Sequence, residues 1–124
     1  YNMKKIAFIC LLITFVACDT NDNPGDLITI CTEEFVFGLK IHVLDANTNT
    51  AILKNASITA TDGDYTEALV FNLDRFFGAG ERAGTYVLTI SAKGYQTLIT
   101  NPISVGADEC HVITQQRDFL LSQN

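Results

Sequence analysis

The chain has 124 residues, of which 14 are acidic and 8 are basic, giving a formal net charge of −6 at pH 7. A length of this order predicts a single domain. Proteins that bind nucleic acids neutralise phosphates with clustered Lys and Arg, and the few basic residues here are scattered along the chain. The composition therefore argues against a nucleic-acid partner.

The first segment has the pattern of a secretion signal. Lys4 and Lys5 precede an apolar run at residues 6–17, which ends at Cys18. A transmembrane helix needs about 20 apolar residues, so this run is too short to span a bilayer. Basic residues, a short apolar run and a small residue at the cut site are typical of a cleaved secretory signal. We therefore expect residues 1–17 to be a signal peptide.

The end of this segment, Phe15-Val16-Ala17-Cys18, resembles the lipobox of bacterial lipoproteins, although the family usually has Leu at the first of these positions. The resemblance implies that Cys18 is acylated and becomes the first residue of the mature chain. Lipoproteins of this type carry three acyl chains, and several chains anchor a protein stably where one does not. The alternative is an ordinary signal peptide with an unrelated cysteine.

Loss of residues 1–17 would remove two lysines and leave 14 acidic and 6 basic residues, a formal charge of −8. Such acidity favours solubility and repels anionic surfaces. Asp, Asn, Pro and Gly dominate residues 19–26 and predict a flexible tether. We therefore expect residues 18–30 to be the lipidated cysteine and its tether, and residues 31–124 to be the folded domain.

Two cysteines remain for the domain once Cys10 is assigned to the signal and Cys18 to the lipid. These are Cys31 and Cys110, which lie at the two ends of the predicted strand set. Export places them in an oxidising compartment, where such a pair can form a disulfide. Two free thiols are the alternative. A metal pair is disfavoured because no CxxC or HxxxH spacing accompanies them.

Alternating apolar and polar residues predict strands from residue 35 onward. In the first strand, the apolar residues at every second position share one face: Phe35, Phe37, Leu39, Ile41 and Val43. The same pattern predicts further strands at residues 56–61, 69–73, 85–91, 95–100, 103–105 and 111–121. Residues 69, 71 and 73 are expected to share the buried face of the third strand. Turn residues separate the strands, notably Asp62-Gly63-Asp64 and a glycine-rich stretch at residues 76–84. Six or seven short strands of this kind predict an all-β fold, an antiparallel β-sandwich.

Several stretches resemble carboxypeptidase regulatory-like domains, which are prealbumin-like sandwiches with Greek-key connections. The stretches are GLKIHVLDANTNTAILKNASIT (38–59), ERAGTY (81–86), KGY (93–95) and CHVITQQRDFLL (110–121). The resemblance covers about residues 35–121 and implies that Tyr86 lies in the core and Tyr95 at a sandwich edge. It also implies that the first and last strands lie near each other, so that Cys31 and Cys110 can meet. In this family the domain accompanies a zinc peptidase or stands alone on bacterial surface proteins, which implies no catalytic activity of its own.

The sequence lacks the patterns of common catalytic, metal and cofactor sites, and we expect neither an enzyme nor a bound cofactor or metal. Both histidines, His42 and His111, are expected to be surface or hydrogen-bonded residues of strands. One candidate binding element is a predicted loop with Arg75, Phe76 and Phe77. Exposed aromatic side chains can stack on sugars or anchor a protein partner. The alternative is that the two phenylalanines plug the open end of the sandwich.

These observations predict a non-catalytic lipoprotein that is anchored in the membrane and binds or scaffolds an unknown protein or glycan partner. A carbohydrate-binding module of a glycan-uptake system is one alternative, and a small hydrolase on a prealbumin-like scaffold is another. Asp19 directly follows the lipid cysteine. This pattern resembles an inner-membrane retention signal in enteric bacteria, whereas other diderm bacteria have acids there on surface lipoproteins. We expect the outer membrane and cell surface, with the inner membrane as the alternative.

Overall fold

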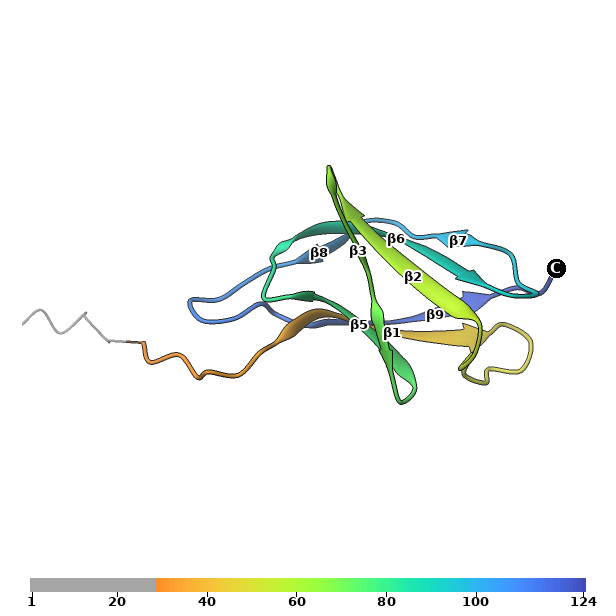
Figure 1. The fold of residues 1–124 in the computed structure, drawn as a ribbon, viewed down its shortest axis with the longest axis horizontal. Helices are drawn as coiled ribbons and strands as arrows, with labels where there is room; N and C mark the ends of the chain where they lie inside the picture. The colour runs from red at the N-terminus through yellow and green to blue at the C-terminus, as the bar shows by residue number, and fades with distance from the viewer. Residues whose placement is uncertain (1–28) are drawn as a thin grey trace, which may run out of the picture.

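The structure is a computed structural model that describes residues 29–124. This part of the chain contains no helix, and nine strands form two sheets that face each other as a β-sandwich (Figure 1). The all-β fold class predicted from the sequence is confirmed, with nine strands in place of six or seven. The predicted signal peptide, the predicted lipid attachment at Cys18 and the tether up to residue 28 lie outside the described residues.

The first sheet has the strand order β4-β5-β1-β9. Its strands are β1 (Phe37–Asp45), β4 (Val70–Asn72), β5 (Arg75–Gly80) and β9 (Gln115–Leu121). β1 and β9 run parallel, with Leu39 opposite Gln115 and Val43 opposite Phe119. The other neighbours in this sheet are antiparallel. The last strand of the chain therefore lies directly beside the first.

The second sheet has the strand order β3-β2-β6-β7, and β8 pairs with the beginning of β6. Its strands are β2 (Ala56–Asp62), β3 (Tyr65–Ala68), β6 (Gly84–Ala92), β7 (Leu98–Ile99) and β8 (Ile103–Val105). All of its pairs are antiparallel. The predicted Asp-Gly-Asp turn joins β2 to β3, and Gly63 adopts a φ of 57° there. Glycine suits this position because it has no Cβ to clash in the left-handed region.

The core between the sheets is built from alternate residues of the central strands. Its most deeply buried members are Leu39, Ile41 and Val43 of β1, Ile58 and Ala60 of β2, and Tyr86, Leu88 and Ile90 of β6. The hydroxyl of Tyr86 donates a hydrogen bond to the carbonyl oxygen of Arg82 over 2.8 Å, so burial leaves no unpaired polar atom on this ring. Tyr86 thus occupies the core position that the sequence predicted.

The alternation predicted for the first strand is wrong at its beginning. Phe35 and Phe37 are exposed, whereas Gly38 is buried and faces the core. A Cβ on Gly38 would lie 2.6 Å from Cγ1 of Val105 and 3.0 Å from the carbonyl oxygen of Ala79. Ala79 itself adopts a positive φ of 51°. The backbone of Gly38 therefore lies close to that of Ala79, and Phe35 and Phe37 point outward.

The third strand predicted at residues 69–73 is present as β4 (Val70–Asn72), but the buried face expected for residues 69, 71 and 73 is wrong. β3 belongs to the second sheet and β4 to the first, and Leu69 lies between them in the core. Phe71 is only partly covered, and Leu73 is 87% exposed in the turn before β5, with a φ of 60°. Residues 75–80, predicted as part of a glycine-rich loop, form strand β5. This strand forms because its backbone pairs with β1, and the local sequence did not predict that pairing.

Candidate functional site

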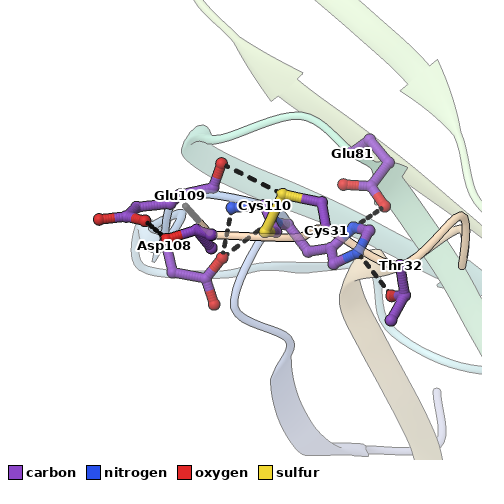
Figure 2. The surroundings of a disulfide bond; sticks show 8 residues. Cys31, Thr32, Glu81, Asp108, Glu109 and Cys110 are labelled. Atoms are coloured by element: carbon purple, nitrogen blue, oxygen red, sulfur yellow. Dashed lines mark hydrogen bonds and ion pairs between the residues drawn. A yellow bond between two sulfur atoms is a disulfide. The ribbon is translucent and has the colours of Figure 1, made fainter. Parts of the chain in front are cut away.

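A disulfide joins Cys31 to Cys110 at the end of the sandwich where the described chain begins (Figures 1 and 2). Cys31 lies six residues before β1, and Cys110 lies in the loop between β8 and β9. Their Cα atoms are 5.1 Å apart, within the range that a disulfide spans. The predicted pairing is confirmed over the alternative of two free thiols.

The loop that carries Cys110 is shaped by Asp108. One oxygen of this carboxylate accepts hydrogen bonds from the backbone N–H groups of Cys110 and His111, each over 2.8 Å. These two bonds favour the ionised form and hold the pKa of Asp108 below its usual value. The carboxylate thereby fixes the backbone of Cys110 and of the residue that follows it.

His111 connects this loop to two other segments. Its Nδ1 lies 2.8 Å from a carboxylate oxygen of Glu81, and its Nε2 lies 3.1 Å from the hydroxyl of Thr32. The same Glu81 oxygen accepts the backbone N–H of Val36 over 2.8 Å. Figure 2 shows Thr32 and Glu81 on the same side of the disulfide, across from Asp108 and Glu109. We call the disulfide and these three side chains, Thr32, Glu81 and His111, the N-terminal clasp, because they fasten residues 31–36 to the sandwich.

Glu81 and His111 stabilise each other's charged forms. The hydrogen bond to Glu81 is the largest cause that raises the pKa of His111 above its ordinary value. The pKa of Glu81 is lowered, first by the N–H of Val36 and then by the bond from His111. A protonated imidazole and an ionised carboxylate are therefore both favoured.

The clasp also places a hydroxyl, an imidazole and a carboxylate in one hydrogen-bonded row. This is the order of groups in serine-hydrolase triads, where the imidazole accepts the hydroxyl proton and the carboxylate orients the ring. Sequence reasoning assigned no such role to His111. Its partners, Thr32 and Glu81, are 79 and 30 residues away along the chain, and no local spacing signals their meeting.

The three residues of the predicted binding loop do not act together. Phe76 is buried in the core and its ring packs 5.0 Å from that of Phe71. Phe77 points to the outer face of the first sheet, since its register partner on β1 is Lys40. Arg75 lies on the same outer face, within 4.0 Å of Asp118. One phenylalanine therefore fills the core and the other lies half-buried on the outer face.

The outer face of the first sheet carries a cluster that we call the aromatic patch, formed by Phe35, Phe37, Val70 and Phe77. The rings of Phe35 and Phe37 are 5.2 Å apart, and those of Phe37 and Phe77 are 5.5 Å apart. Val70 is the register partner of Phe77 on β4. Phe35, Phe37 and Val70 are 62%, 37% and 63% exposed. Three segments of the chain thus contribute to one exposed apolar surface.

A polar network closes the opposite end of β1. Asp45 is buried, accepts the hydroxyl hydrogen of Tyr95 over 2.6 Å and accepts the side-chain amide of Gln123 over 2.9 Å. It also accepts backbone N–H groups in the turn after β1. The bond from Tyr95 is the largest of several that hold the pKa of Asp45 far below its usual value. This network accounts for Tyr95 structurally and leaves no free carboxylate for chemistry.

His42, the other histidine, lies on the outer face of the first sheet, 3.6 Å from Asp118. Among residues 29–124, no group of three or more His, Cys, Asp or Glu side chains is arranged to hold a metal ion. The same residues enclose no pocket, and they form no helix that is long and apolar enough to cross a membrane. Neither a family model nor a curated protein sequence matches the chain.

Proposed function

We propose that the chain is a membrane-anchored envelope lipoprotein whose β-sandwich binds or scaffolds a partner without catalysing a reaction. The observation that carries this proposal is the N-terminal clasp. It fastens the segment nearest to the predicted lipid attachment, through the Cys31–Cys110 disulfide, to the loop that leads into β9.

The position of the clasp suits a domain that is held by its N-terminus. The first residues of a domain fray easily unless they are tied down. A pull on the tether would reach Cys31 first and pass through the disulfide to Cys110, and only then reach β1. The pull is therefore shared between the two neighbouring strands of the first sheet. The resemblance to carboxypeptidase regulatory-like domains, which stand on bacterial surfaces as accessory modules, supports the same role.

The anchor is tested by expressing the full chain and its Cys18→Ala variant in a bacterium supplied with a labelled fatty acid. The wild-type chain should incorporate label and partition into detergent, and the variant should do neither. Cys31 and Cys110 serve as internal controls, because paired sulfurs cannot be acylated. Label on the variant, or unchanged partitioning, would refute the anchor. Protease treatment of intact cells then tests the surface location, since an exposed domain is released and a periplasmic one is protected.

A hydrolase is the second candidate function, and the row formed by Thr32, His111 and Glu81 favours it. In such a reaction neutral His111 would take the Thr32 hydroxyl proton as that oxygen attacks an ester carbonyl. His111 would then give the proton to the departing alkoxide, and water would hydrolyse the acyl group from Thr32. The assay is hydrolysis of an activated phenyl ester by wild type, His111→Gln and Thr32→Val. A rate that depends on both side chains supports the hydrolase, and equal rates in all three proteins support the non-catalytic module.

A further inference from the structure

The aromatic patch presents large apolar side chains to solvent on the outer face of the first sheet. Contiguous apolar surfaces with polar surroundings mark contacts with proteins or membranes. The ring of Phe35 lies directly over Gly80, in the space that a Cβ there would fill. The ring–ring contacts with Phe37 and Phe77 hold the patch in one arrangement, so little order has to be gained when it binds.

We propose that the aromatic patch rests on the lipid bilayer to which the chain is anchored, so that the outer face of the first sheet is turned toward the membrane. This inference depends on the proposed lipid anchor for its biological setting. It adds an orientation and a second, weaker membrane contact that no lipid attachment by itself would provide.

The distance between anchor and patch favours a membrane over other occupants. Cys31 lies 13 positions after Cys18, and Phe35 follows four positions later. The flexible tether that the sequence predicts would have an r.m.s. span of about 20 Å at this length, and a domain of this size has a radius of gyration of about 13 Å. The end of the sandwich that bears Phe35 is therefore held next to the bilayer. A contact formed there benefits from a high effective concentration of lipid.

The chemistry of the patch matches the boundary between lipid headgroups and acyl chains. Phenylalanine is one of the residues that membrane-surface proteins bury at this depth. The Nζ of Lys40 lies over the Phe77 ring, 6.0 Å from its centre, so a cation borders the apolar surface while its charged end stays in water. Glu33 and Glu34 precede Phe35 and offset that positive charge. Binding should therefore depend on apolar contact and be insensitive to salt.

The chain contains no tryptophan, so a single Phe35→Trp substitution provides a unique fluorescent reporter in the patch. Ile99→Trp is the matched control, because Ile99 is 67% exposed and lies on β7 of the second sheet. The protein begins at Cys18 and retains every residue that the structure describes. Cys18 is coupled to a maleimide lipid in phosphatidylcholine vesicles, and the paired Cys31 and Cys110 do not react. The vesicles contain either ordinary or acyl-brominated lipid, which quenches a buried indole.

The tryptophan at position 35 should shift its emission to shorter wavelength on vesicles and lose intensity when the lipid is brominated, because the indole enters the boundary between headgroups and acyl chains. The control at position 99 should keep its spectrum. Adding Phe37→Asn to the Phe35→Trp protein should reduce the quenching, with an unchanged circular dichroism spectrum showing that the fold is kept. Equal behaviour of the two reporters would overturn the proposal. A shift at position 35 that appears without vesicles, on raising the protein concentration or on adding soluble glycans, would also overturn it in favour of a second copy or a sugar.

Chemical coupling makes this result independent of acylation in the cell. If Cys18 is not acylated but the reporter at position 35 is quenched, the proposed anchor fails and the membrane contact stands. If Cys18 is acylated and the reporter is not quenched, the contact fails and the anchor stands.

Discussion

Removal of the Cys31–Cys110 disulfide should destabilise the domain strongly. The perturbation is the double substitution Cys31→Ser and Cys110→Ser, which leaves no unpaired thiol in the sandwich. The crosslink spans 79 residues, almost the whole of the described chain. In the chain-entropy account, a loop of this length restricts the unfolded state by about 4.5 kcal/mol at 25 °C.

The folded state should change little, which makes the unfolded state the main source of the effect. Thr32 and Val36 keep their hydrogen bonds to His111 and Glu81 in the absence of the sulfur bridge. Native disulfides contribute about 2–4 kcal/mol in practice. For a domain of 60–100 residues each kcal/mol corresponds to about 4–8 °C, so the melting temperature should fall by about 10 °C or more.

Thermal unfolding followed by circular dichroism measures the shift, and adding a reductant to the wild-type domain should reproduce it. The double variant is the control for the reductant, because its own melting temperature should not respond. A shift of less than about 2 °C would contradict the entropic argument. Two free thiols in the mass spectrum of the unreduced protein would contradict the disulfide itself.

Two further predictions concern Gly38 and His111. Gly38→Ala should lower the free energy of unfolding by about 1–3 kcal/mol, because the new methyl group would collide with Val105 and the backbone of Ala79. Urea denaturation measures this loss. Gly106→Ala is the control and should show no loss, because nothing lies near the new atom there. The hydrogen bond to Glu81 raises the pKa of His111 in the folded state. The stability that this pair contributes should therefore be complete below the ordinary histidine pKa of about 6.5. It should be lost as the pH rises through the higher pKa of the folded state. Urea midpoints at about pH 5.5 and about pH 8.5 should therefore differ more in wild type than in His111→Gln, and an equal difference in both would show that the pair does not act in this way.

Period-two alternation located the central strands well, because it reports a local property of the backbone. In β6, Tyr86, Leu88 and Ile90 face the core as predicted, since successive side chains of a strand point to opposite faces. The turn at Asp62-Gly63-Asp64 was equally predictable, because glycine at a positive φ is a local requirement. The pairing of Cys31 with Cys110 was inferred from the number of cysteines left and from the expected compartment.

The surface features depended on contacts between distant residues. Phe35 and Phe37 continue the alternation of β1 in the sequence, yet the close approach of Gly38 to Ala79 turns them outward. Phe77 joins them only because β5 pairs with β1, and no local pattern predicted β5 as a strand. The aromatic patch could therefore not be predicted from the sequence, although Phe77 belonged to the predicted binding loop.

Local sequence patterns were enough to predict the all-β class, the alternating core of the central strands and the two cysteines available to pair. Each of these follows from the chemistry of neighbouring residues or from simple counting. Long-range packing brings Thr32, Glu81 and His111 together and makes the phenylalanines at the start of β1 face outward. Both outcomes arise where segments far apart in the chain compete for the same space and the same hydrogen bonds, and that competition is settled by packing rather than by local preference.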